Sequence, residues 1–198
     1  MRLRVVKVGG SLFACADLKR RISAWLASQR TMPTILIAGG GMFADAVRQF
    51  DAVHALRSAD SHRLALQSMR LASAALATLS PEWDWIDGTS RLRQQLASLA
   101  AQTCAFDYVG VWNVCDYWQA EVEPTLAPAT LNWTLTSDTI AAALASRWQA
   151  DSLALFKSCA APGETIADWS AAGGVDAQFA SAAAGLSVTW VNLRLQEK

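Results

Sequence analysis

Two short apolar runs near the start of the chain each end in glycines and each precede a helical pattern. Residues 4–8 form a mostly β-branched run that stops at Gly9-Gly10-Ser11, and residues 34–38 form a second run that stops at Gly39-Gly40-Gly41. Apolar residues at helical spacing then cover residues 17–29 and 42–56. Two strands that each lead through glycines into a helix predict an α/β fold with a mainly parallel sheet.

The rest of the chain continues this alternation. The spacing predicts further helices over residues 62–79, 91–100, 139–148 and 175–184. Apolar runs predict further strands over residues 108–112, 152–156 and 188–193. Pro124 and Pro128 mark an irregular connection between them. Because the chain contains no repeat, low-complexity segment or linker, we expect a single domain.

Composition narrows the class of protein. Lys and Arg number 17 and Asp and Glu number 17 among 198 residues, so the chain has no excess positive charge for nucleic acid or an acidic membrane surface. Hydrophobic residues make up 53% of the chain and charged residues 17%, which excludes a disordered protein. No apolar run approaches the roughly 20 residues that cross a bilayer. We therefore expect a soluble globular protein without nucleic-acid or membrane partners.

The cysteine pattern favours a reducing compartment. The chain has four cysteines with no C-x-x-C pair, namely Cys15, Cys104, Cys115 and Cys159. A small disulfide scaffold would be far denser in cysteine. The pattern predicts buried thiols and a cytoplasmic protein.

Charged and glycine residues gather where the predicted strands end. Lys7 precedes the first glycine pair, Asp138 follows Ser137 at a predicted helix start, and Lys157 ends an apolar strand. The carboxyl ends of parallel strands meet at one edge of a sheet, and that edge is where ligands bind in open α/β folds. Glycines there let backbone N–H groups approach an anion, and a lysine adds a positive charge. The pattern predicts a phosphate site at this edge.

Other chemistries fit less well. Residues 39–44 satisfy G-x-G-x-x-A with Asp60 at the distance of a ribose-binding acid, which leaves a dinucleotide-binding enzyme as an alternative. The histidines are His54 and His62, which excludes a three-histidine metal site, and we expect His62 to be a surface or helix-capping residue. Trp112, Trp118 and Trp133 favour a core or a subunit interface over a ligand cage.

The order of the motifs resembles the amino acid kinase family, which includes aspartate, acetylglutamate and uridylate kinases. Members begin with a strand and K-x-G-G-S, continue with a second strand and G-G-G, and later carry S-D or T-D at a helix start. This chain has Lys7-Val8-Gly9-Gly10-Ser11, then Gly39-Gly40-Gly41, then Ser137-Asp138. The resemblance implies a single-domain three-layer α/β/α sandwich over residues 1–198. It assigns acceptor binding to about residues 1–130 and an abbreviated nucleotide-binding part to about residues 131–198.

Within the family the chain is most similar to the short subgroup linked to methanofuran-type cofactor biosynthesis. The similarity lies in G-M-F-A-D-A-V-R at residues 41–48, in Asp60-Ser61-His62-Arg63 and in the compact length. That subgroup's enzyme uses ATP to convert an aminomethylfuran-methyl phosphate into its diphosphate. The resemblance therefore implies a small-molecule kinase with a phosphorylated acceptor.

The resemblance also implies roles for individual residues. Lys7 and Lys157 would act on the transferring phosphoryl group, and Asp138 would orient the lysines. The nucleotide phosphates would be held by Gly9, Gly10, Ser11 and Ser137, and the acceptor by Gly39, Gly40 and Gly41. Mg²⁺ would accompany ATP, with no metal ligand assigned to the protein. Since an acceptor phosphate is already ionised near pH 7, the reaction needs no strong general base.

One departure from the family motivates an alternative. In relatives the strand that ends here at Lys157 commonly runs into a Thr-Asp or Lys-Asp pair and then a glycine, whereas this chain reads Lys157-Ser158-Cys159 and lacks that aspartate. The alternative is a non-catalytic member of the fold that binds a small anion or a partner subunit. Because the family is generally oligomeric, the resemblance also implies a homo-oligomer.

Overall fold

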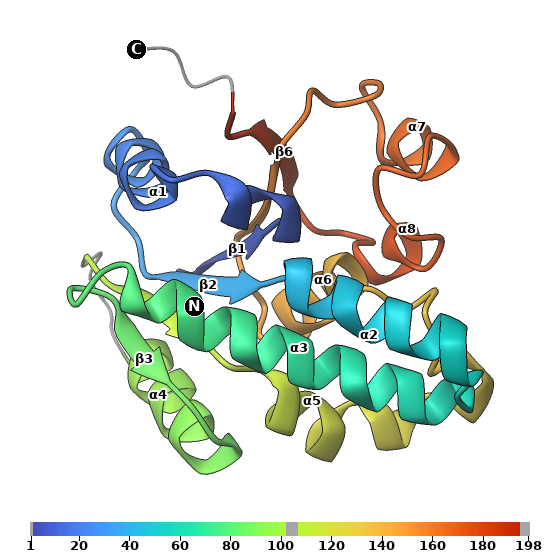
Figure 1. Ribbon diagram of the computed structural model, residues 1–198. Helices are drawn as coiled ribbons and strands as arrows, with labels where there is room; N and C mark the ends of the chain where they lie inside the picture. Colours follow the sequence, from blue (N-terminus) through green and yellow to red (C-terminus); the bar gives the residue numbers. More distant parts are fainter. Residues whose placement is uncertain (1, 102–106, 195–198) are drawn as a thin grey trace.

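A single parallel sheet organises the molecule (Figure 1). The structure is a computed structural model that describes residues 2–101 and 107–194. Within these residues the sheet has six strands in the order β3-β4-β2-β1-β5-β6, and all of its strand pairs are parallel. The strands are β1 (Arg4–Val8), β2 (Thr34–Ala38), β3 (Asp84–Ile86), β4 (Val109–Trp112), β5 (Ser152–Lys157) and β6 (Val188–Asn192).

Helices cover both faces of the sheet. The α-helices are α1 (Leu18–Ala27), α2 (Gly41–His54), α3 (Ser58–Thr78), α4 (Thr89–Ala101), α5 (Cys115–Glu121), α6 (Ser137–Arg147), α7 (Ile166–Ala171) and α8 (Phe179–Ala182). Short 3₁₀ turns complete the set: η1 (Gly10–Ala14), η2 (Glu123–Thr125) and η3 (Pro128–Thr130). One core packs the sheet against α4, α5, α6 and α8, and a second core packs its other face against η1, α1 and the C-terminal half of α3. The predicted three-layer α/β fold with a parallel sheet is confirmed.

The alternation of side chains along β1 divides it between the two cores. Val5 belongs to the core under α6, whereas Val6 and Val8 belong to the core under α1. Because successive side chains of a strand point to opposite faces, Lys7 shares the face of Val5. The Lys7 side chain therefore points towards α6.

Most of the predicted helices and strands are present, but many begin or end at other residues than predicted. The strand β3 and the helices α5 and α7 were not predicted, because each is too short to show a clear periodicity. The predicted helix over residues 175–184 is wrong in its first part: only Phe179–Ala182 is helical. Asp176 makes hydrogen bonds to the start of α6, which holds residues 175–178 outside a helix.

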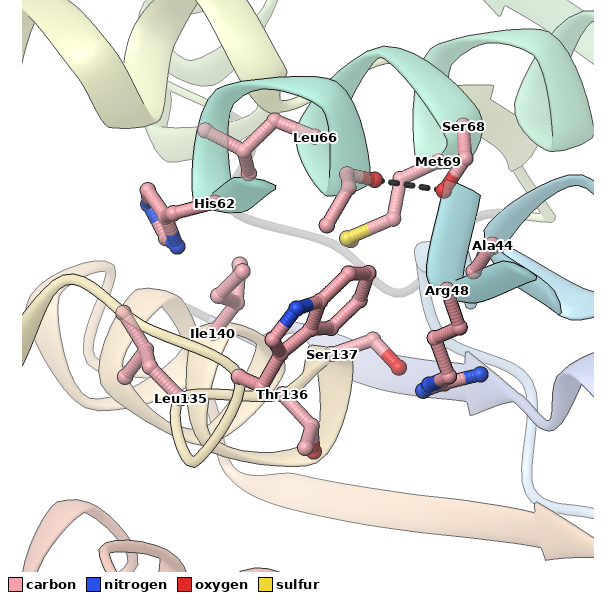
Figure 2. A pocket seen from close by; sticks show the side chains of 13 residues that line it. Ala44, Arg48, His62, Leu66, Ser68, Met69, Leu135, Thr136, Ser137 and Ile140 are labelled. Atoms are coloured by element: carbon pink, nitrogen blue, oxygen red, sulfur yellow. Dashed lines mark hydrogen bonds between the residues drawn. The ribbon is translucent and has the colours of Figure 1, made fainter. Parts of the chain in front are cut away.

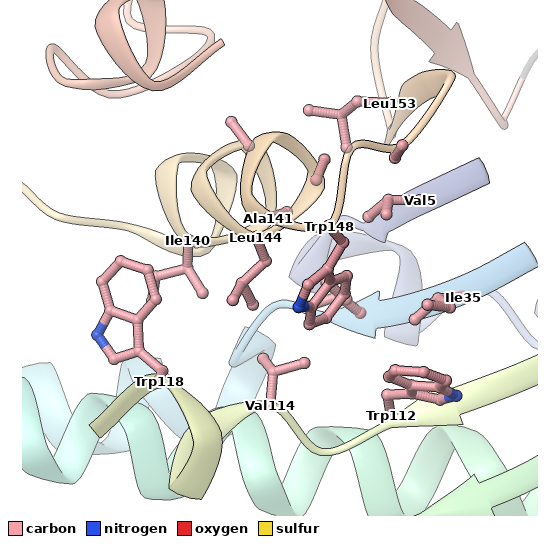
Figure 3. Close-up of a cluster of buried hydrophobic side chains, with 14 of the residues drawn as sticks. Val5, Ile35, Trp112, Val114, Trp118, Ile140, Ala141, Leu144, Trp148 and Leu153 are labelled. Atoms are coloured by element: carbon pink, nitrogen blue, oxygen red, sulfur yellow. The ribbon is translucent and has the colours of Figure 1, made fainter. Parts of the chain in front are cut away.

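Tryptophans fill the core beneath α6 (Figure 3). Trp112 and Trp118 are buried, and the Trp112 ring lies 5.6 Å from that of Trp148 between their centroids. The prediction of a core role is confirmed for Trp112 and Trp118. Trp133 instead borders a pocket described below.

The cysteines divide between core and surface. Cys115 is buried, and burial raises the pKa of its thiol to about 12. Cys159 is exposed and Cys15 half-buried, so the prediction of buried thiols is wrong for these two. Cys159 is exposed because it lies in the loop after β5 and outside the two cores. Cys104 lies outside the described residues. Among the helices that the structure describes, none is long and apolar enough to cross a membrane.

Candidate functional site

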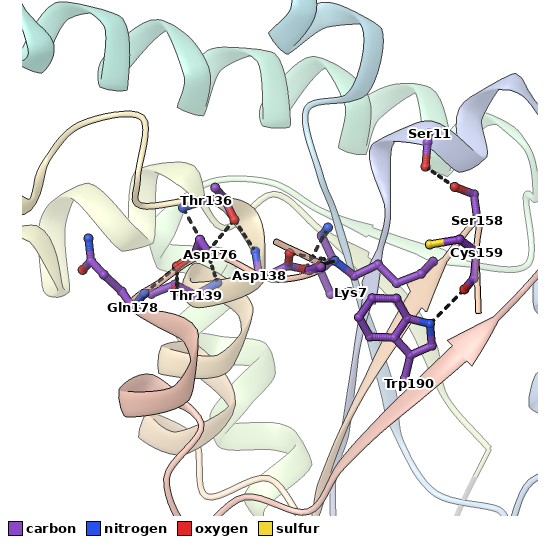
Figure 4. Close-up of polar contacts among 12 residues, drawn as sticks. Lys7, Ser11, Thr136, Asp138, Thr139, Ser158, Cys159, Asp176, Gln178 and Trp190 are labelled. Atoms are coloured by element: carbon purple, nitrogen blue, oxygen red, sulfur yellow. Dashed lines mark hydrogen bonds and ion pairs between the residues drawn. The ribbon is translucent and has the colours of Figure 1, made fainter. Parts of the chain in front are cut away.

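Two lysines and one aspartate meet at the carboxyl edge of the sheet. Lys7 Nζ lies 3.0 Å from Asp138 Oδ1, and Lys157 Nζ lies 2.8 Å from Asp138 Oδ2 (Figure 4). The Lys157 ammonium group also donates to the Gly174 carbonyl at 2.7 Å. The three charged side chains are at most 12% exposed. We call Lys7, Asp138 and Lys157 the lysine cluster.

Strand register brings the two lysines to the same face. β1 pairs with β5 so that Lys7 lies opposite Leu155, and Lys157 is two residues further along β5. Residues two apart on a strand share a face, so both lysines face α6. Thr136 caps α6, and its hydroxyl accepts from the Asp138 N–H, which places the Asp138 carboxylate in the first turn. The chain thus joins segments more than a hundred residues apart at one carboxylate.

The charges of the two lysines favour the ionised form of Asp138. Burial raises the pKa of the Asp138 carboxyl, but the positive charges of Lys7 and Lys157 outweigh this effect, and the pKa lies below its ordinary value. Burial, together with the charge of Lys7, lowers the pKa of Lys157, and the Asp138 carboxylate opposes this shift. Each Asp138 oxygen lies against one ammonium group, so this one carboxylate holds two cations.

The two glycine motifs form one structural unit. A Cβ placed on Gly10 would lie 2.4 Å from the Gly41 Cα, and Gly41 itself has a φ of +55°. Neither position tolerates a side chain, since the two backbones touch and Gly41 adopts a left-handed conformation. η1 and α2 begin at these glycines, so the N-terminal ends of both helical turns lie side by side. Such ends present unpaired N–H groups, which favour an anion.

A polar cavity of about 510 Å³ opens over the lysine cluster and the glycines. It is lined by nine of the residues predicted from the sequence: Lys7, Gly10, Ser11, Gly39, Gly40, Gly41, Ser137, Asp138 and Lys157. Gly9 lies outside this lining, and its N–H donates to the Phe156 carbonyl. Gly9 therefore joins β1 to β5 and has no N–H left for a phosphate. The sequence did not single out Arg48, Gly173 and Gly174, which also line the cavity.

Ser11 has a partner within the protein. Its hydroxyl shares a hydrogen bond of 2.8 Å with the hydroxyl of Ser158, just beyond the end of β5 (Figure 4). The next residue, Cys159, accepts from the Trp190 indole through its carbonyl. Trp190 in turn packs under Lys157, whose Nζ lies 5.1 Å from the ring centroid. The segment that departs from the family pattern is thus tied to both sides of the cavity.

A second, apolar pocket adjoins the polar cavity (Figure 2). It has a volume of about 60 Å³ and shares Gly40, Ala44, Arg48, Thr136 and Ser137 with the larger cavity. Its remaining lining is mainly apolar, from α3, α6 and the segment before α6: His62, Ala65, Leu66, Ser68, Met69, Trp133, Leu135 and Ile140. A ligand that fills both spaces would therefore have one charged end and one small apolar end.

Polar groups at the boundary of this pocket are paired. The Arg48 guanidinium lies 5.0 Å from the centroid of the Trp133 ring and 2.6 Å from Asp45. The Trp133 indole N–H donates to Asp51 at 2.6 Å, which fixes the orientation of the ring. Trp133 was expected in a core or interface. Its role as a pocket wall depends on this contact between α2 and the irregular segment before α6.

The expectation that His62 is a surface or capping residue is wrong. α3 begins at Ser58, one turn earlier than predicted, and His62 is only 4% exposed. Its Nε2 lies 2.9 Å from Glu123 Oε1, so the imidazole links α3 to η2 at the end of the apolar pocket. Asp60, the acid required by the dinucleotide-binding alternative, is paired with Arg57 and Arg63 and does not line the cavity.

The described residues fit phosphates better than a metal held by the protein alone. Residues 2–101 and 107–194 contain no group of three His, Cys, Asp or Glu side chains that could hold a metal ion. In the cavity, Asp138 is occupied by two lysines, and Asp45 is paired with Arg48. Mg²⁺ commonly binds through substrate phosphates and water with few carboxylates, so this lining fits Mg²⁺ carried by a nucleotide.

Comparison with known proteins supports the fold. No protein-family model matches the chain, and no curated protein matches it significantly. Among solved structures, the crystal structure of uridylate kinase from Archaeoglobus fulgidus matches with a TM-score of 0.51 and 15% identity, covering 84% of this chain and 70% of that one. The chain has the amino acid kinase fold. This outcome confirms the fold implied by the motifs in β1, β2 and α6.

Proposed function

We propose that this protein transfers a phosphoryl group from ATP to a small phosphorylated acceptor. The observation that carries the proposal is the lysine cluster, buried at the end of a cavity whose other walls are glycines and helix starts. Phosphoryl transfer needs positioning and neutralisation of charge more than covalent chemistry. Two ammonium groups held by one carboxylate, beside the N-terminal ends of η1 and α2, supply both the positioning and the positive charge.

Each residue then has a definable task. Lys7 and Lys157 would neutralise the oxygens of the transferring phosphoryl group. The N–H groups of Gly10 and Ser11 at the start of η1 would bind nucleotide phosphates, together with Ser137. Gly40 and Gly41, at the start of α2, would hold the acceptor, since both line the cavity and Gly40 also lines the apolar pocket.

The reaction balances without a general base. An oxygen of the acceptor phosphate forms a bond to the γ-phosphorus of ATP, the bond from that phosphorus to the β-phosphate oxygen breaks, and ADP leaves. The second pKa of a phosphate monoester is about 6, so the attacking oxygen is already ionised at neutral pH. Asp138 is ion-paired with both lysines and would act by placing them.

Nucleotide and metal enter together in this proposal. ATP supplies the phosphoryl group, and Mg²⁺ bound to its phosphates adds positive charge. The described residues contribute the lysines and backbone donors. Trp190 packs under Lys157 and next to Gly174, and so supports the cavity from outside its lining.

For the acceptor we propose an aminomethylfuran-methyl phosphate, which would become the diphosphate in methanofuran-type cofactor biosynthesis. The sequence similarity around residues 41–48 and 60–63 supports it, since both segments belong to the hairpin of α2 and α3 beside the apolar pocket. The pocket's volume of about 60 Å³ suits a small ring better than a nucleoside. Uridine monophosphate, the acceptor suggested by the neighbour's name, would place a ribose and a base there.

Calorimetric titration with MgATP tests the nucleotide half of the proposal. We expect the wild type to bind MgATP, Lys7→Ala to lose binding, and Lys19→Ala on α1 to retain it. A second assay then measures ADP release with furan-type phosphates and with uridine monophosphate as acceptors. Equal binding by wild type and Lys7→Ala would contradict the assigned phosphate site.

The alternative of a non-catalytic binding protein predicts different results. If the alternative holds, a small anion binds at the lysine cluster, and the protein releases no ADP from ATP with any acceptor. A homo-oligomer is compatible with both functions, and gel filtration with light scattering tests it directly.

A further inference from the structure

The Asp176 carboxylate lies at the start of α6, although it belongs to the segment before α8. Its Oδ2 accepts hydrogen bonds from the Thr136 N–H and hydroxyl and from the Thr139 N–H. Its Oδ1 accepts from the Thr139 hydroxyl and from the Gln178 N–H (Figure 4). Five donors thus converge on one carboxylate, four of them from residues 37 or 40 positions away in the sequence.

These contacts join the two segments that hold Lys157. The Lys157 ammonium group has two acceptors: Asp138 on the first turn of α6 and the Gly174 carbonyl on the segment before α8. Asp138 lies between Thr136 and Thr139, and Gly174 lies two residues before Asp176. A displacement of one segment relative to the other would separate the two acceptors and release the ammonium group.

We propose that Asp176 is a positioning residue for Lys157, because its carboxylate fastens the Gly174 segment to the first turn of α6. Asp176 lies outside the lining of the polar cavity, so it acts through Lys157 and Asp138 and not on a ligand. The effect on catalysis rests on the proposed function, whereas the positioning of Lys157 does not.

Asp168 also accepts hydrogen bonds at the start of a helix, but its partners are all close in the sequence. At the start of α7, Asp168 accepts from the Thr165 N–H and hydroxyl, and Thr165 accepts from the Asp168 N–H in return. All of these contacts lie within three residues. Asp168→Asn therefore weakens the capping box of α7 without altering a contact of the lysine cluster, which makes it the matched control for Asp176→Asn.

The first measurement observes Lys157 directly and needs no activity. The chain has four lysines, at positions 7, 19, 157 and 198, so selective ¹³C,¹⁵N-lysine labelling gives a small set of signals, and Lys157→Arg assigns the Lys157 signal. We expect Asp176→Asn to shift this signal and to move its titration towards that of an exposed lysine. Asp168→Asn should leave both unchanged. Thr139→Val, which removes one donor to Asp176, should give a smaller shift in the same direction.

The second measurement is kinetic. We expect kcat to fall about 10²-fold in Asp176→Asn, as misplaced reacting groups do, with little change in the KM for MgATP. A wild type that transfers no phosphoryl group would refute the proposed function and leave the lysine signals to decide the positioning role. A Lys157 signal that stays in place in Asp176→Asn would overturn the proposal. If that variant does not fold, an unchanged signal in Thr139→Val overturns it instead.

Discussion

The polar cavity and the apolar pocket share a wall but are built in different ways. The cavity depends on backbone and buried charge: glycines at two strand ends, two lysines and one carboxylate. The pocket depends on side chains from α3, α6 and the segment before α6, with the His62 ring held against Glu123 at one end. The cavity therefore suits any phosphate group, whereas the pocket suits the shape of one particular acceptor. Substitutions in the two should therefore have separable effects.

The largest expected effect on activity comes from the cavity. Lys7→Ala removes one of the two positive charges proposed to face the transferring phosphoryl group, and kcat should fall by at least about 10²–10³-fold. Lys19→Ala on α1 is the matched control and should retain full activity. Steady-state assays with circular dichroism distinguish lost chemistry from lost folding. A fully active Lys7→Ala enzyme would end the assignment of this cavity as the reaction site.

The largest expected effect on stability comes from the same cluster. Asp138→Asn leaves two buried ammonium groups without their counter-charge, which costs about 3–5 kcal/mol in the free energy of unfolding. Urea denaturation at pH 7 measures the loss. Raising the pH should narrow the difference from wild type, since deprotonated lysines need no counter-charge. A difference that does not change with pH would show that the lysines are hydrated in the variant.

The pH dependence of activity should come from Lys157. Its pKa is lowered from 10.5 by burial and by Lys7, so activity should fall with rising pH at a value below 10.5. The Asp138 pKa lies below 3.8, so the stability that its ion pairs contribute is present above pH 3.8 and is lost only as the pH falls through the lowered value. Lys157→Arg supplies a group that stays charged, and its residual activity should lack the alkaline decline.

The smallest and most selective effect on activity is expected from a substitution in the apolar pocket. Met69→Phe narrows the apolar pocket, and overpacking of this kind costs about 1–3 kcal/mol. We expect the KM for the acceptor to rise about tenfold, as 1.4 kcal/mol does, while calorimetric binding of MgATP stays the same. Met69→Leu preserves the volume and should behave as wild type. Weaker MgATP binding in Met69→Phe would mean that the two spaces are not independent.

Local sequence was sufficient for much of the cavity. Lys7, the glycines and Asp138 each lie next to a strand end or a helix start, which the hydrophobic periodicity and the turn residues predict. Parallel strands then bring their carboxyl ends to one edge of the sheet. Gly9 shows the limit, because a loop pattern does not say which N–H groups the sheet itself uses. Its N–H bonds to Phe156, a residue 147 positions away that only strand pairing identifies.

The pocket left no comparable signal. The sequence does not show that His62 and Trp133 meet at one pocket, because their surroundings come from contacts between separate helices and loops. His62 is buried because η2 places Glu123 against it, and Trp133 is a wall because Asp51 accepts from its indole. Side-chain pairs of this kind depend on how helices pack, which periodicity does not describe.

By itself the sequence determined the alternation of strands and helices, the glycine loops and the chemical nature of the edge, since these follow from spacing and residue type within short segments. Tertiary structure alone decided that β5 lies beside β1 in a register that puts Lys7 and Lys157 on one face. It also decided that Asp176 fastens α6 and that an apolar pocket opens beside the cavity. The reason is physical: pairing and packing energies act between residues that are close in space, whatever their separation along the chain.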